Sequence, residues 1–320
     1  MKNNIGVCVL LIFLAFSCKN ENQIASEIAM INIEVDVERF DRMFSQSQPE
    51  DLSELKAAYP FMFSSRFTDQ DWIDRLQDTL QIQIHNEVNR TFSTFEEEED
   101  DIRQLFKHLK YYYKEFKTPR VITVTNDVDY RNKSIVTDTI VLIALDNYLG
   151  PDHEFYGGIQ NYLRKNFKRE MIVSDLAEAY AKQLIFQSET NTFLDDMIYF
   201  GKLLYFKDQM IPFVQDELKI GYTKSELEWA KVNESNIWSN FIENELLYST
   251  DPKLQGRFIR PAPFSKFNLG LDRESPGRIG CYIGWQIVKA YMENNTVEFK
   301  QMLTKDADEI FRNSKFKPEK

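Results

Sequence analysis

Three charged residues of the segment Arg169–Gln187 have the types and spacing that acid–base chemistry needs. Asp175 and Glu178 are three residues apart, so on a helix their carboxylates lie one turn apart and can pair a general acid with a general base. Lys182 follows Glu178 at a spacing of four residues, which favours an ion pair along the helix as the simpler interpretation. We interpret these three side chains as structural or as the lining of a cleft, and assign them no catalytic role.

Histidines are too few and too scattered for a zinc site of the usual helical design. That design needs two imidazoles four residues apart on one helix, with a glutamate between them to activate water. The chain has only His85, His108 and His153, and none of them lies on the helix expected over Arg169–Gln187. The carboxylates of that helix are hard oxygen ligands, which suit calcium or magnesium better than zinc. We therefore expect no metal site, no cofactor and no catalytic residues.

Other catalytic and ion-binding motifs receive little support. The sequence contains no Gly-x-Ser-x-Gly elbow and no phosphate loop that ends in Gly-Lys-Ser/Thr. Cys281 with His153 would make a thiol–imidazole pair, but a cysteine at the start of an apolar helix is typical of a small buried hydrophobe. The acidic run 96–101 lacks the spaced oxygens and the glycine of an EF-hand. It favours a solvated helix start, where carboxylates complement the helix dipole.

The first residues indicate export from the cytoplasm. Lys2 precedes an apolar run over residues 5–16. A helix that spans a membrane needs about 20 apolar residues, so this shorter run predicts a secretory signal peptide, which we place at residues 1–17.

A cysteine directly follows the predicted signal peptide. The segment Leu14-Ala-Phe-Ser-Cys18 resembles the lipobox of bacterial lipoproteins, in which the cysteine receives diacylglycerol and becomes the mature N-terminus. Phe16 is bulkier than the common residue at its position, which leaves an ordinary signal peptide as the alternative. We expect lipidation at Cys18, a tether over residues 18–29 and a single domain over residues 30–320.

Composition limits the partners of this domain. The formal net charge of −11 argues against a nucleic-acid partner and against electrostatic attraction to anionic lipid. If Cys18 is acylated, Cys281 is the one thiol left after the signal peptide, so no internal disulfide can form. Stability must therefore come from the core, for which the chain supplies 25 Phe, 15 Tyr and 4 Trp.

The elements that position the acidic pair are a small sheet and a central helix. The helix over Arg169–Gln187 has one broad apolar stripe opposite its charged side. Before it, β-branched residues predict a strand at Arg120–Thr125 and one or two strands within Ser134–Leu145. Alternation from Ile31 to Val37 predicts a further short strand that passes into a helix near Arg39. A sheet embedded among helices makes the fold α+β and mainly helical.

Several further amphipathic helices are expected around this centre. A capping box at Thr223 opens one of them. Gly280 and Gly284, four residues apart on another, would let a second backbone approach closely, which is typical of tight packing more often than of a binding loop. The expected helices include Leu52–Tyr59, Trp72–Phe92, Asp101–Phe116, Leu194–Phe206, Met210–Leu218 and Phe299–Phe311.

Five segments, in their order and spacing, suggest a family. They are the lipobox at Cys18 and the stretches Leu145–Gly150, Tyr162–Phe167, Ile172–Gln183 and Arg278–Val288. Together these segments resemble the gliding-motility lipoprotein GldB of Bacteroidetes, and the similarity covers essentially the whole chain. The resemblance implies an envelope lipoprotein needed for movement over surfaces, in organisms whose motility machinery is coupled to their own protein secretion system. That family brings no catalytic residues.

The order of two strands, a helix and a later Gly-x-x-x-Gly helix is also similar to zinc peptidases with His-Glu-x-x-His on the central helix. Because the histidines are missing here, the resemblance implies a zincin-like scaffold that is catalytically empty.

Two functions of different classes follow. The first is a non-enzymatic lipoprotein, anchored by its lipid in a membrane that faces the periplasm or the cell surface, which binds or stabilises other gliding-motility or secretion-machinery proteins of the envelope. The second is a lipid-anchored hydrolase that acts on peptide or cell-wall substrates through carboxylates. A cleft lined by Asp175, Glu178 and further carboxylates with raised pKa values would favour the hydrolase.

Overall fold

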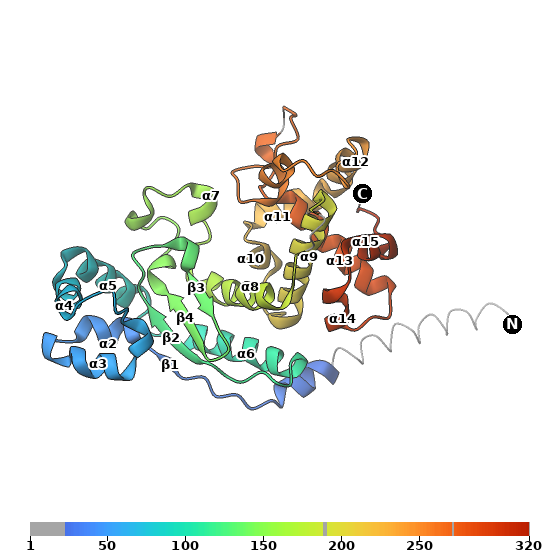
Figure 1. Ribbon diagram of the computed structural model, residues 1–320. Coiled ribbons are helices and arrows are strands. Elements are labelled where there is room, and N and C mark those ends of the chain that lie inside the picture. Colours follow the sequence, from blue (N-terminus) through green and yellow to red (C-terminus); the bar gives the residue numbers. More distant parts are fainter. Residues whose placement is uncertain (1–22, 188–190, 271, 320) are drawn as a thin grey trace.

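In the computed structural model a small mixed sheet lies between two groups of helices (Figure 1). The structure describes residues 23–187, 191–270 and 272–319, so the predicted signal peptide and Cys18 lie outside the described residues. Residues 23–29, in the second half of the expected tether, are helical, and Ile28 among them is buried. Across the described ranges, no helix is both long and apolar enough to cross a membrane.

The sheet has the strand order β1-β2-β4-β3. The strands β1 and β4 run parallel to β2, and β3 runs antiparallel to β4. Their bounds are β1 (Val37–Glu38), β2 (Arg120–Val124), β3 (Ser134–Val136) and β4 (Ile140–Ala144). The strands expected at Arg120–Thr125 and within Ser134–Leu145 are therefore confirmed.

The strand expected from Ile31 to Val37 was predicted too long. Only Val37 and Glu38 pair with β2, whereas residues 31–36 carry no ladder of their own. Ile33 and Val35 are nevertheless buried in the main core. The alternation of apolar residues thus reports burial on one side of an extended segment, and burial alone does not require a partner strand.

Both faces of the sheet are covered. Ile122 and Val124 of β2 pack against the aromatic rings of α2 (Phe40–Gln46) and residues of α3 (Leu52–Ala58). The residues of opposite parity, such as Val121 of β2, belong to the core beneath α6 (Glu96–Tyr112) and α8 (Ile172–Leu184). Successive side chains of a strand point to opposite faces, so β2 is apolar on both sides. This confirms the α+β prediction of a small sheet before a central helix.

The helix expected over Trp72–Phe92 is two helices, α4 (Asp69–Gln77) and α5 (Thr79–Thr91). Asp78 separates them in an extended conformation, and its carboxylate accepts a hydrogen bond of 2.9 Å from the backbone N–H of Gln81. The prediction was wrong because the apolar spacing continues across the break. The break itself depends on a local cap, which periodicity does not detect.

The acidic run 96–101 forms the first turns of α6, so the prediction of a helix start is confirmed. It is not solvated throughout, because Glu98 is buried and forms an ion pair with Arg169 at the entrance to α8. Burial, together with the neighbouring carboxylates, raises the pKa of Asp101 to about 6.

Two long helices, α9 (Phe193–Met210) and α13 (Ile279–Asn294), cross in backbone contact. A Cβ atom on Gly284 would lie 1.8 Å from the carbonyl oxygen of Met197, and one on Gly201 would lie 2.3 Å from the carbonyl oxygen of Gly284. Only glycine lets the helices approach this closely. The tight packing expected of Gly284 is thus present.

Short helices complete the second group, which lies on the right in Figure 1. Thr223 forms the predicted capping box. The expected helix Met210–Leu218 was wrong, because Met210 ends α9 and the next helix begins at Asp216. The expected helix Phe299–Phe311 is broken by Asp306, which caps the second half. The short helices of this group are α10 (Asp216–Ile220), α11 (Lys224–Val232), α12 (Glu234–Glu243), α14 (Phe299–Thr304) and α15 (Ala307–Ser314). The short helix α7 (Asn161–Arg164) lies apart from them, above the sheet in Figure 1.

Candidate functional site

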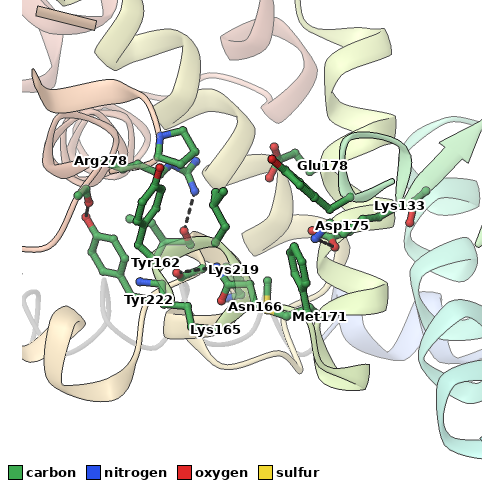
Figure 2. A pocket seen from close by; sticks show the side chains of 18 of the residues that line it. Lys133, Tyr162, Lys165, Asn166, Met171, Asp175, Glu178, Lys219, Tyr222 and Arg278 are labelled. Carbon is green, nitrogen blue, oxygen red and sulfur yellow. Dashed lines mark hydrogen bonds and ion pairs between the residues drawn. The ribbon is translucent and has the colours of Figure 1, made fainter. Parts of the chain in front are cut away.

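A cavity of about 530 Å³ opens beside the charged face of α8 (Figure 2). Its walls come from α7, α8, α9, α10, the start of α13 and the loop before β3. We call it the basic cavity, because seven of its charged lining residues are cations and two are carboxylates. The cations are Arg131, Lys133, Lys165, Lys182, Lys207, Lys219 and Arg278, and the carboxylates are Asp175 and Glu178.

Asp175 and Glu178 have separate cationic partners. Lys133 donates to a carboxylate oxygen of Asp175, and the hydroxyl of Tyr148 donates to the same oxygen at 2.9 Å. Glu178 forms ion pairs with Lys182 at 2.7 Å and with Lys207 at 2.8 Å. The ion pair predicted along the helix between Glu178 and Lys182 is therefore confirmed. Each carboxylate is thus neutralised by its own cations, and the two carboxylates do not share a proton.

Lys207 reaches this site from α9 and is almost fully buried, with 2% of its side chain exposed. Its ammonium donates to Glu178 at 2.8 Å, to the backbone oxygen of Lys219 at 2.8 Å and to the hydroxyl of Ser174 at 3.2 Å. An ammonium has three N–H donors, so these contacts use all of them. Ser174 and Glu178 lie one turn apart on α8, and the ammonium fills the space between them and α9.

The electrostatics keep Glu178 ionised. Burial raises the pKa of Glu178, but three cations outweigh burial and hold this pKa well below its ordinary value. These cations are Lys207, Lys182 and Arg278, in order of effect. A general acid or base works best with a pKa near the ambient pH, so this carboxylate is poorly suited to proton transfer.

Arg278 lies at the opposite end of the cavity wall, directly before α13 (Figure 2). Its backbone is left-handed, with φ of 61°. Its guanidinium donates one bond of 2.9 Å to the carbonyl oxygen of Ile220, the last residue of α10. The neighbouring carbonyl of Gly221 accepts a bond of 3.0 Å from the side-chain amide of Asn166. Two cavity side chains thus satisfy carbonyls that the end of α10 leaves without helical partners.

The residues that the sequence singled out lie in two different places in the structure. Asp175, Glu178 and Lys182 line the basic cavity together. Gly280 and Gly284 instead serve helix packing. A Cβ atom on Gly280 would lie 2.9 Å from a side-chain carbon of Ile259, and Gly284 faces the backbone of α9.

Cys281 and His153 have different partners. The Cys281 thiol is fully buried and donates to the carbonyl oxygen of Ile259 at 3.5 Å. Burial raises the pKa of Cys281 to about 11, so the thiol stays protonated. The imidazole of His153 instead contacts the carboxylate of Glu87 at 3.1 Å. The prediction that Cys281 is a small buried hydrophobe is confirmed.

Sequence reasoning missed Lys207 and Arg278. A signal existed for Lys207, since its neighbours at helical spacing on α9, Leu203, Leu204 and Met210, are apolar and buried. A lysine in such a place is rarely buried without a partner. Arg278 offers no local signal, because its contact with the end of α10, the hydrogen bond to Ile220, forms only in the folded chain. In the described parts of the chain, no group of three or more His, Cys, Asp or Glu residues is arranged to hold a metal ion.

A model of the family described as "Gliding motility protein GldB" matches residues 21–318 of the chain. No curated protein and no solved structure matches this chain. The relation to zincin-like scaffolds consequently stays a prediction, whereas the family match spans nearly all of the described residues.

Proposed function

This chain belongs to the gliding motility protein GldB family, and from that premise we propose that it is an envelope lipoprotein that serves the gliding apparatus as a non-enzymatic binding component. Its ligand or partner is engaged through the basic cavity. Its partners are other proteins of the motility or secretion machinery in the cell envelope, and it reaches its membrane through a lipid on Cys18 rather than through a spanning helix.

The observation that supports binding over catalysis is the environment of Glu178. Two lysines pair with this carboxylate at 2.7 Å and 2.8 Å, and its pKa is held low. Asp175 is likewise engaged by Lys133 and Tyr148. A carboxylate that transfers protons must exchange them near neutral pH, whereas a paired carboxylate fixes the positions of its cationic neighbours.

The alternative is a hydrolase that uses carboxylates. It would gain support from additional acidic residues in the cavity with raised pKa values. The charged residues that line the cavity beyond Asp175 and Glu178 are all cations, which favours the binding function. A purified protein with one tightly bound zinc ion per chain, and a hydrolase activity that chelators remove, would establish the alternative.

Deletion of the gene should stop spreading over surfaces while growth in liquid continues, because the family acts in motility. The measurement is colony spreading and single-cell movement on glass, with the gene restored in trans as the control. A clean deletion strain that glides normally would overturn the proposed function.

Replacing Cys18 by serine should release the protein from the membrane fraction and leave it folded. A serine has no thiol to acylate, and the lipidation site precedes the domain predicted over residues 30–320. Fractionation of cells with detection by antibody measures the outcome. Cys8→Ser is the matched control, because Cys8 lies within the predicted signal peptide. A Cys18→Ser protein that stays membrane-bound, with no partner protein to retain it, would contradict the assignment of the anchor.

A further inference from the structure

One wall of the basic cavity has more positive than negative charge. Lys182 and Lys207 form ion pairs with the single carboxylate of Glu178, and Arg278 adds a favourable charge interaction with it. This leaves a local excess of two positive charges. The other cations that line the cavity have carboxylates of their own, in the pairs Lys133–Asp175, Lys165–Glu226, Lys219–Asp208 and Arg131–Asp129.

Two of these three cations can reach a ligand. Lys207 is buried, and its three donors are occupied by Glu178, Ser174 and Lys219. Lys182 keeps 52% of its side chain exposed. Arg278 is partly buried at the cavity wall, and its guanidinium contacts both the carbonyl oxygen of Ile220 and the thiol of Cys281. A guanidinium has five N–H donors, so donors remain for a ligand.

The backbone of Arg278 indicates that its side chain has a use. Its φ of 61° places it in the left-handed region, which glycine adopts freely and arginine adopts only at an energetic cost. Strained residues of this kind cluster at binding sites, where the surrounding structure holds them. The conformation directs a guanidinium to the cavity at the point where α13 begins.

The cavity accommodates more than an isolated ion. Its volume of about 530 Å³ falls in the range of sites for small organic ligands. Aromatic and amide side chains provide part of the remaining wall, from Tyr130, Tyr162, Phe167, Tyr222 and Asn166. A ligand with a ring or short chain attached to an anionic group would contact both kinds of wall.

The charge of the whole chain limits the charge of the ligand. At a formal net charge of −11, the protein repels highly charged polyanions over long distances. Inside the cavity the local excess of cations attracts an anion instead. The ligand class that satisfies both conditions has one or two negative charges.

We propose that the basic cavity binds a small molecule or chain end that carries a carboxylate or phosphate group, with the anion held by Arg278 and Lys182. Charge-assisted hydrogen bonds from a guanidinium suit both anions, because its donors match two oxygens at once. The inference names the ligand class for the cavity of the proposed function and rests on that function only for its biological setting.

The test is calorimetric titration of the full-length protein, purified in detergent, with glucuronate and inorganic phosphate as the probes. Glucose is the uncharged match for glucuronate. Wild-type protein should bind both anions and not glucose. Arg278→Gly and Lys182→Gln should each weaken anion binding about tenfold to a hundredfold, because each removes a charged hydrogen-bond donor.

These variants separate binding from folding. Arg278→Gly accepts the left-handed backbone but loses the hydrogen bond to Ile220, and the Lys182 side chain is about half exposed. Both proteins should therefore still melt cooperatively, with Arg278→Gly at a somewhat lower temperature than wild type. Arg273→Gly, at an exposed position outside the cavity, is the control and should bind as wild type does. Equal anion affinity in all four proteins, absence of anion binding to the wild type, or glucose binding as tight as glucuronate binding would overturn the proposal. None of these outcomes affects the gliding phenotype of the deletion strain, so the two proposals can fail separately.

Discussion

Glu178→Gln is expected to lower the free energy of unfolding by about 3–5 kcal/mol, because it leaves the buried ammonium of Lys207 without a neutralising charge. Lys207 is 2% exposed, so water cannot replace the lost carboxylate. Urea denaturation at pH 7 measures the loss. Glu309→Gln is the matched control, since Glu309 pairs with Lys305 while both side chains are 37% exposed, and its cost should be much smaller because water screens the pair.

The loss should depend on pH in a defined direction. The pKa of Glu178 is depressed in the folded protein, so its contribution is fully present above the unfolded pKa and disappears as the pH falls through the folded value. The difference in stability between wild type and Glu178→Gln should therefore begin to narrow below about pH 4 and should close only at a pH well below the ordinary pKa of a glutamate. Adding Lys207→Met to Glu178→Gln should recover much of the stability, because the unpaired charge is removed. Equal stability of Glu178→Gln and wild type at pH 7 would contradict the ion pair between Glu178 and the buried Lys207.

Gly284→Ala should cost about 3 kcal/mol or more, at the upper end of the range for overpacked cores. The new methyl group would lie 1.8 Å from the carbonyl oxygen of Met197, a backbone atom that cannot rotate away. The helices α9 and α13 would have to separate. Thermal and urea denaturation measure the effect, and Gly158→Ala is the control, since a Cβ atom there meets nothing within 4 Å.

The same substitution should also disturb the basic cavity. Lys207 belongs to α9, and Arg278 directly precedes α13, so separation of the two helices moves two cations relative to Glu178. Gly284→Ala should therefore weaken anion binding even at temperatures where the protein stays folded. A variant as stable as wild type would show that the two backbones are not in contact.

The sequence predicted the elements better than it predicted their ends. The apolar stripe of α8 and the capping box at Thr223 are local patterns, and both appear in the structure. The breaks at Asp78 and Asp306 were missed, because apolar spacing continues through each break while a single aspartate caps the second helix. A cap of this kind consists of one or two residues, so it produces no periodic pattern in the sequence.

The cavity was predicted only in part, for a related reason. Asp175, Glu178 and Lys182 lie on one helix, so their common face followed from helical spacing. Lys207 lies on another helix, and Arg278 lies at the start of a third, so their approach to Glu178 depends on tertiary packing. The sequence therefore showed a pair of carboxylates with one lysine, whereas the folded chain surrounds them with an excess of cations.

We propose that this protein supports gliding by binding a ligand through the basic cavity. The most direct measurement is colony spreading of the deletion strain after complementation with the double variant Arg278→Gly/Lys182→Gln, at a level in the envelope equal to that of wild type. We predict that the double variant fails to restore spreading, whereas wild type and Arg273→Gly restore it. Full spreading with the double variant would contradict the claim.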